Sequence, residues 1–222
     1  ERWTYDENKQ LVITSGGFAG ITAEYDSRGY MVKMMHHGAD GELCEMNEGY
    51  AGIYYEYNAN GDVIKYSCVG TDLEPTTGND NVCTMVLDRD LNGNIVKVSF
   101  FDVENYSTLS SEGISVMKFK YDDNGNEVSR QFFDQDDNLT KGNLGYAQLE
   151  RTYDENGGEA SYRYYDENHN LVLVDGLAGR DYKRDNRGNV IEDMPVGLDN
   201  KLAKGYLLAT KKYDDRDNNT EF

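Results

Sequence analysis

Cysteine, proline, tryptophan and basic residues are all scarce in this 222-residue chain, which has 3 Cys, 2 Pro, 1 Trp and 22 Lys plus Arg. The three cysteines, Cys44, Cys68 and Cys83, show no CxxC spacing and share no repeated place, so neither a disulfide framework nor a zinc site is indicated. No stretch approaches the ~20 apolar residues that a membrane-spanning helix needs, so we expect no membrane insertion.

Basic residues are outnumbered by 41 Asp plus Glu, which gives a net charge of −19. Such a charge repels nucleic-acid phosphate, whose binding needs clustered Lys and Arg. It favours cations, basic partners and solubility, although a solvated acidic surface with no specific partner is the more common explanation of such a charge. Nucleic acid is therefore excluded as a partner.

The dominant feature is a repeat of about 32 residues, seen first in the residues that open each unit: Phe18, Tyr50, Val82, Ile114, Tyr146, Leu177 and Tyr206. A fixed period of this size marks an array of supersecondary units, each unable to bury its own apolar face alone. We number the repeats 1 to 7 from Phe18, with position 1 at the opening residue. The predicted organisation is a single array over 1–222, with repeats at 18–49, 50–81, 82–113, 114–145, 146–176 and 177–205 and partial repeats at 1–17 and 206–222.

Both ends of the sequence fall inside a repeat. The opening residues WTYDEN match the second half of a repeat, and the last residues stop halfway through repeat 7. We therefore expect either a fragment of a longer array or an array that starts and stops on half-repeats.

Each repeat carries the pattern of a β-hairpin. Apolar and polar residues alternate with period two in the first strand, as in Ser115, Met117, Phe119 and Tyr121, and an Asp-x-Asn-Gly turn such as Asp122 to Gly125 follows. The predicted fold is all-β, an elongated array of stacked hairpins that is solenoid-like or a curved single sheet. First strands are predicted at 18–25, 50–57, 82–88, 114–121 and 146–153. Position 4 is predicted to form one continuous buried row: Ile21, Ile53, Met85, Met117 and Leu149.

The motifs YDENGG, YDDNGN and WTYDEN resemble the tyrosine-aspartate repeats of bacterial surface and Rhs-type proteins. The segments FFDQDDN and YYDENHN are similar, more weakly, to the aromatic hairpin repeats of bacterial wall-binding proteins. Both resemblances imply β-hairpin arrays outside the cytoplasm, in an extracellular or cell-surface bacterial location. Neither implies a catalytic residue.

The turns invite a calcium hypothesis, because Asp134, Asp136 and Asn138 place oxygen atoms on alternate residues, as the start of an EF-hand loop does. The bidentate Glu that closes an EF-hand loop is missing, and Asp and Asn are also what hairpin turns prefer. We therefore expect no metal and no other cofactor.

Tyrosine is the remaining candidate for function, with 18 Tyr against 7 Phe. An outward row of tyrosines is able to stack on sugar rings, whereas an inward row belongs to the core. The candidate ligand-binding residues are Tyr54, Tyr162, Tyr164 and Tyr165.

Catalysis is not expected, because no nucleophile motif accompanies His36, His37 or His169. A repeat array can nevertheless carry function where its sequence departs from the repeat. The residues that do so here are His36, His37 and the variant region Cys68 to Cys83.

Two functions follow from these observations. The first is a non-enzymatic secreted or cell-surface protein that binds a glycan or a protein through an exposed strand face. The second is a purely structural spacer or shell segment of a larger Rhs-like surface protein.

Overall fold

The computed structural model describes residues 1–214 and 216–221. The chain divides into an N-terminal unit, Glu1–Val116, and a C-terminal unit, Met117–Phe222. The strands are β1 Arg2–Trp3, β2 Gly20–Tyr25, β3 Met31–His37, β4 Gly52–Tyr57, β5 Val63–Val69, β6 Thr84–Arg89, β7 Ile95–Phe101, β8 Val116–Tyr121, β9 Glu127–Phe133, β10 Gln148–Tyr153, β11 Glu159–Tyr165, β12 Gly179–Arg184, β13 Val190–Val196, β14 Ala209–Thr210, β15 Lys212–Tyr213 and β16 Asn219–Glu221.

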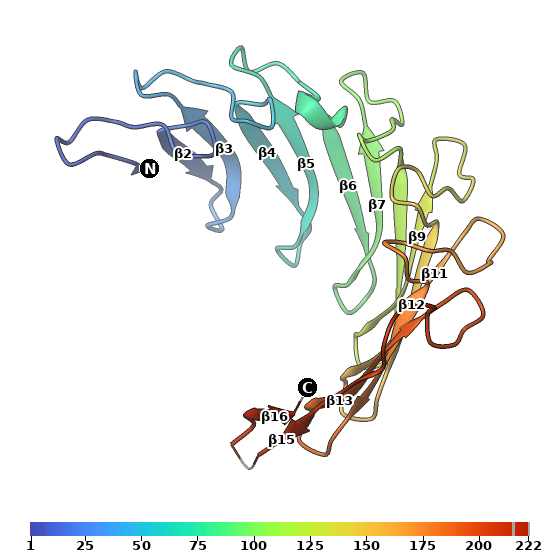
Figure 1. The fold of residues 1–222 in the computed structure, drawn as a ribbon. Coiled ribbons are helices and arrows are strands. Elements are labelled where there is room, and N and C mark those ends of the chain that lie inside the picture. Colours follow the sequence, from blue (N-terminus) through green and yellow to red (C-terminus); the bar gives the residue numbers. More distant parts are fainter. Residues whose placement is uncertain (215, 222) are drawn as a thin grey trace. The chain divides into compact units, whose positions relative to one another are not determined.

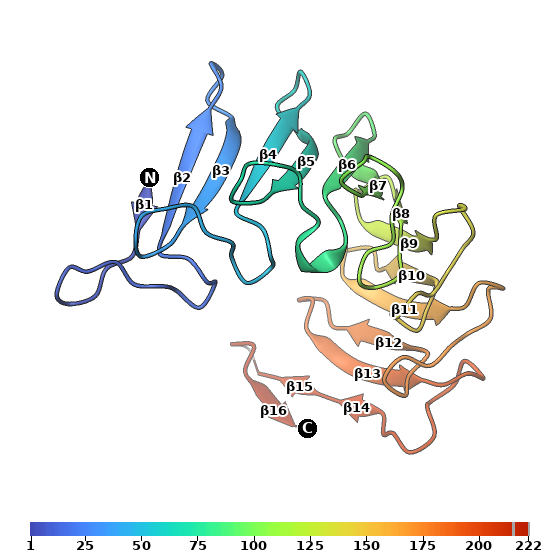
Figure 2. The same cartoon turned by 90° about the horizontal axis from the view of Figure 1, so that it is seen from above.

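The all-β prediction is confirmed. Strands β1 to β14 follow one another in sequence order in an antiparallel sheet, and β15 pairs with β16. Figures 1 and 2 both show β4, β5 and β6 side by side in the N-terminal unit. In the described residues the sole helical segment is one 3-10 turn, Gly78–Asp80.

The predicted first strands are confirmed, but each begins two residues later than predicted. In repeat 2, for example, Tyr50 and Ala51 lead from the preceding loop into β4, which starts at Gly52. The second strands are one residue longer than the first, as in repeat 2, where β5 extends to Val69 and pairs with β4 from end to end.

A carboxylate or amide at position 9 organises each hairpin turn. The Asp122 carboxylate oxygen Oδ1 accepts hydrogen bonds from the backbone N–H groups of Asn124 and Asn126, both at 2.9 Å. Gly125 ends the turn at φ +83°, a conformation that glycine adopts without strain. Hydrogen bonds of this kind favour the charged form of the carboxyl group, so the pKa of Asp122 lies below its usual value.

The second half of each repeat is a loop that returns to the sheet. In repeat 1 a turn at Gly38–Gly41 is followed by a single bridge from His37 to Leu43. In both units the hairpin turns lie at one end of the strands and these longer loops at the other (Figure 1). The return to the sheet is therefore marked by a single bridging residue rather than by a third strand.

Small residues at position 2 let the loops approach the sheet closely, and none of these side chains is more than 3% exposed: Ala19, Ala51, Cys83, Ser115, Ala147 and Ala178. The predicted buried row at position 4 is correct only in part. Ile53 and Leu149 are buried, with 9% and 4% of their surface exposed, but Ile21, Met85 and Met117 are half-buried.

Candidate functional site

In repeats 2, 3, 5, 6 and 7 the side chain at position 8 links the hairpin to the one before it. Tyr57 donates its hydroxyl proton to the carbonyl oxygen of Met31 at 2.7 Å, and Tyr153 donates to that of Glu127 at 2.9 Å. Where the sequence carries Arg at this position, the same bond is kept. Arg89 donates to the Val63 carbonyl at 3.2 Å and Arg184 to the Glu159 carbonyl at 3.0 Å. We call this contact the position-8 bond; both residue types make it because both are long donors.

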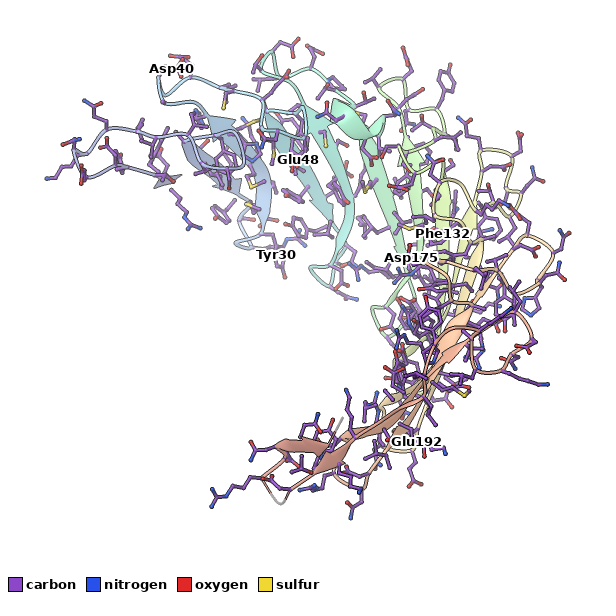
Figure 3. All side chains as sticks on the ribbon, viewed as in Figure 1. Tyr30, Asp40, Glu48, Phe132, Asp175 and Glu192 are labelled. Carbon is purple, nitrogen blue, oxygen red and sulfur yellow. The ribbon has the colours of Figure 1, made fainter. Side chains whose placement is uncertain are left out.

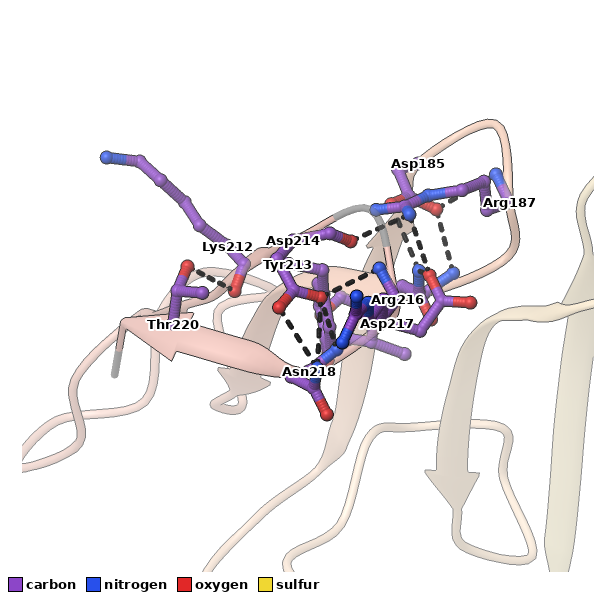
Figure 4. A network of polar contacts seen from close by, with 11 residues as sticks. Asp185, Arg187, Lys212, Tyr213, Asp214, Arg216, Asp217, Asn218 and Thr220 are labelled. Atoms are coloured by element: carbon purple, nitrogen blue, oxygen red, sulfur yellow. Dashed lines mark hydrogen bonds and ion pairs between the residues drawn. The ribbon is translucent and has the colours of Figure 1, made fainter.

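Arginine at position 11 joins the hairpin turns of repeats 1 and 2 and those of repeats 6 and 7. Arg28 donates to the carbonyl of Asn58 at 3.2 Å, and Arg187 donates to the carbonyl of Asp214 at 2.8 Å (Figure 4). Arg187 also forms an ion pair with Asp217 at 2.9 Å. The loops have their own link, since Asn79 donates its amide to the carbonyl of Asn47 at 2.8 Å.

The backbone N–H at position 19 donates to the carbonyl at position 2 of the next repeat, as from His36 to Ala51 at 2.7 Å and from Tyr164 to Ala178 at 2.9 Å. In repeat 6 this position is Pro195, which has no N–H to donate. Strand β13 accordingly pairs with β14 through only two residue pairs, Glu192–Thr210 and Asp193–Ala209. Pro195 therefore weakens the junction between repeats 6 and 7.

The tyrosines predicted to bind a ligand are all half-buried. In the C-terminal unit Tyr162 and Tyr164 lie with their ring centres 5.4 Å apart, and Tyr146 packs 4.6 Å from Tyr164. Tyr165 lies on the opposite face of β11 and stacks on His169 at 4.2 Å. The structure thus brings Tyr162 and Tyr164 together but separates Tyr165 from them.

Tyr54 belongs to the N-terminal unit, on β4, where the ammonium nitrogen of Lys33 lies 5.8 Å from its ring centre. Its neighbour on β5 is Ser67. No second tyrosine pairs directly across from it in the register of that hairpin.

The oxygens of the calcium candidate Asp134 already accept hydrogen bonds from its own turn. Oδ1 accepts the N–H groups of Asp136 at 2.9 Å and Asn138 at 2.8 Å, and Oδ2 accepts the side-chain amide of Asn138 at 3.2 Å. Residues 1–214 and 216–221 contain no cluster of three or more His, Cys, Asp or Glu suited to a metal ion. We predict little or no change in the thermal midpoint of unfolding with millimolar Ca²⁺; a rise of many degrees that Asp134→Ala abolishes would establish calcium binding.

The adjacent histidines point to opposite faces of β3, as successive strand residues do. His36 is 2% exposed and lies 4.8 Å from the Phe18 ring, and burial lowers its pKa. His37 contacts Thr22 at 2.9 Å and the Gly41 carbonyl at 3.0 Å. The carbonyl requires a donor, so Nδ1 carries a proton. Neither histidine faces the other.

A cavity of about 450 Å³ lies in the N-terminal unit beneath the loops of repeats 1 and 2, and its floor includes Cys68 and Val82. Sequence reasoning pointed to the region Cys68 to Cys83 but not to a cavity. The available signal was that positions 19 and 1 carry small side chains here, although position 19 carries a ring in repeats 1, 3, 4 and 5 and position 1 carries one in repeats 1, 2, 5 and 7.

These contacts define an all-β tandem-repeat protein in which side chains at fixed repeat positions join consecutive hairpins. Within the part of the chain that the structure describes, no helix has the length and apolarity that a membrane crossing requires. No protein-family model matches the sequence, and no curated protein matches it.

Several solved structures are similar to the chain. A complex of TcdB2, TccC3 and Cdc42 gives a TM-score of 0.45 at 11% identity, over 88% of this chain and 10% of that chain. TcdB2-TccC3 without its hypervariable C-terminal region gives 0.45 at 10% identity, over 90% and 10%. A Photorhabdus luminescens Tc holotoxin pore gives 0.36 at 12% identity, over 89% and 11%. The chain spans about a tenth of the length of these proteins.

Proposed function

We propose that the chain is a non-enzymatic structural segment, a spacer or piece of shell, within a larger Rhs-like surface protein. The observation that carries this proposal is the use of the repeated polar side chains. Position 8 donates to the neighbouring hairpin, as Tyr153 does to Glu127, and position 9 accepts from its own turn, as Asp122 does from Asn126. Side chains that recur in order to bind a ligand would direct their polar atoms outward instead.

The distribution of exposed tyrosines supports a structural role. Among the described residues the exposed tyrosines are Tyr5, Tyr25, Tyr106 and Tyr206, at 57%, 63%, 70% and 40%. They occupy four different places in the repeat, so they form no row along one face. A row of rings at one repeat position is what stacking along a polysaccharide would need.

The likeness of the Tyr-Asp motifs to the repeats of Rhs-type proteins agrees with this role and favours a bacterial cell-surface or extracellular location. The partner of such a segment is other protein of the same assembly, through which the array continues or which it encloses. Contacts such as the bond from Arg187 to Asp214 illustrate how one repeat holds the next.

Deletion of one whole repeat tests the structural role. Removal of residues 82–113 joins Asn81 directly to Ile114 and preserves the repeat phase, so the shortened chain should still unfold cooperatively, with β-type circular dichroism. Removal of residues 82–97 breaks the phase and should leave the chain largely unfolded. Equal damage from both deletions would contradict a modular structural segment.

Binding of a glycan through Tyr54, Tyr162, Tyr164 and Tyr165 is the alternative function. It is tested by titrating the intact chain with soluble bacterial wall polysaccharides and following tyrosine fluorescence. The structural proposal predicts no saturable change. Saturable binding that Tyr162→Ser abolishes would replace it with a binding function.

A further inference from the structure

Rings at positions 19 and 1 pack against one another along one face of the sheet in each unit. In the N-terminal unit Phe18 lies 4.8 Å from His36, which lies 5.9 Å from Tyr50. In the C-terminal unit Phe132 lies 5.4 Å from Tyr146, which lies 4.6 Å from Tyr164. The row is interrupted after Tyr50, where position 19 is Cys68 and position 1 is Val82.

The cavity lies where position 19 is Cys68 and position 1 is Val82, whereas rings stand at these positions in residues such as Phe100 and Tyr146. Its volume is about 450 Å³, and its walls are Tyr50, Ile53, Tyr66 and Met85 around the small side chains Cys68 and Val82. This size is within the range of pockets that bind small organic ligands. The walls are apolar or aromatic, so the ligand must bring an apolar body.

Two carboxylates, Glu48 and Asp80, stand at the rim of the cavity, and among the described residues no Lys, Arg or His lines it. Figure 3 shows Glu48 on the loop side of β4 and β5. Asp80 is held by Ser111, whose N–H donates to Oδ1 at 3.0 Å and whose hydroxyl donates to the same atom. The Asn79 N–H donates to the Glu48 carbonyl at 2.8 Å. The rim is therefore anionic, and hydrogen bonds to neighbouring loops hold both Glu48 and Asp80 in place.

Apart from these two carboxylates, the lining of the cavity is uncharged at neutral pH. Burial raises the pKa of the Cys68 thiol to about 11 and that of the Tyr50 hydroxyl to about 12. The thiol is therefore not a nucleophile, and the charge of the site resides in its two carboxylates. Tyrosine faces also attract cations, which adds to the preference for a positive ligand.

We propose that this cavity binds a small organic cation with a compact aromatic body, of the arylalkylammonium class. The ring occupies the space left by Cys68 and Val82, and the ammonium group meets Glu48 and Asp80. The site is additional to the structural role of the array, although Asn79 and Ser111 in its lining also bond to neighbouring repeats.

Phenethylammonium and phenylacetate are suitable probes, since they have the same ring and opposite charges. We expect phenethylammonium to bind the intact chain at pH 7 and low salt, and phenylacetate to bind at least tenfold more weakly, as measured by calorimetric titration. Asp80→Asn should reduce the affinity for phenethylammonium severalfold. Asp72→Asn, which changes the net charge equally but lies outside the cavity, should leave it unchanged.

Filling the cavity gives the decisive variant. Cys68→Phe introduces the residue that stands at position 19 in Phe100 and Phe132, so it should abolish binding while the chain remains folded. Val82→Tyr, which copies the residue at position 1 in Tyr50 and Tyr146, provides a second filling variant if the first does not fold. Chemical-shift changes on the Met85 methyl group should accompany binding in the unsubstituted chain. Equal affinity for the two probes, absence of binding, or binding that survives both filling variants would overturn the proposal.

Discussion

Position 24 of the repeat has a left-handed backbone, and its occupant is glycine only once in the full repeats. Gly41 has φ +85° there, whereas Leu73 adopts φ +68° at the same position in repeat 2. A bulky side chain is strained in this region by about 1–2 kcal/mol. Leu73 is 44% exposed, so its burial compensates for the strain only in part.

Leu73→Gly should therefore stabilise the chain by about 0.5–1 kcal/mol, because relief of strain exceeds the entropy that glycine loses on folding. Denaturant unfolding measures the change. The matched control is Gly41→Leu, which should destabilise by a similar amount. A loss of stability in Leu73→Gly would mean that contacts of the leucine side chain outweigh the strain.

The position-8 bond leads to a second prediction, on the stability cost of changing a single residue. Tyr153→Phe removes only the hydroxyl that donates to the Glu127 carbonyl, so it should cost about 1 kcal/mol in the free energy of unfolding. Tyr25 occupies the same position in repeat 1 but is 63% exposed and makes no hydrogen bond through its hydroxyl to the described residues, so Tyr25→Phe should be neutral. Tyr153→Arg should restore part of the stability, as Arg89 and Arg184 indicate. Equal losses from the two Phe variants would refute the role of the bond.

Between two strands that share a repeat position, burial decides the cost of truncation. Leu149 on β10 and Met117 on β8 share position 4, but Leu149 is 4% exposed whereas Met117 is half-buried. Leu149→Ala should therefore cost about 2–5 kcal/mol, and Met117→Ala about half as much or less. Chemical denaturation of both variants tests this order. A larger loss of stability in Met117→Ala than in Leu149→Ala would mean that the Met117 side chain is more deeply packed than its exposure indicates.

Hairpins were predictable at the level of elements because both of their determinants are local. Alternation such as Met117, Phe119, Tyr121 specifies a half-buried strand, and Gly125 specifies where it turns. The role of Tyr153 was not predictable, because its acceptor lies 26 residues earlier on another hairpin. The cavity was hidden for a similar reason, since it depends on two small residues, Cys68 and Val82, that meet only when neighbouring repeats pair.

At the scale of the whole molecule, the same carboxylates both stabilise and destabilise the fold. Among the described residues, seven aspartates have a pKa below the usual value, mostly through hydrogen bonds from their own turns: Asp26, Asp90, Asp122, Asp134, Asp166, Asp185 and Asp214. A carboxyl group whose pKa is lower in the folded than in the unfolded chain stabilises the fold above its unfolded pKa of about 3.9. That stabilisation is lost as the pH falls through the folded pKa. Opposing it at pH 7 is the mutual repulsion within a net charge of −19.

These two effects predict a maximum of stability at mildly acidic pH. As the pH falls from 7 towards the isoelectric point of about 4.4, repulsion declines while the turn aspartates remain charged, so the thermal midpoint should rise to a maximum near pH 5. Below about pH 4 the aspartates take up protons and the midpoint should fall steeply. Circular dichroism melts from pH 3 to 8 at low salt measure the curve. Added NaCl should raise the midpoint at pH 7 more than at pH 5, because salt screens the repulsion.

Asp122→Asn is the control, since Asn58 shows that an amide accepts both turn bonds, at 2.9 Å, without a charge to titrate. This variant should flatten the acid limb, and a midpoint that stays constant from pH 7 to 3 would show that the turn carboxylates do not govern stability.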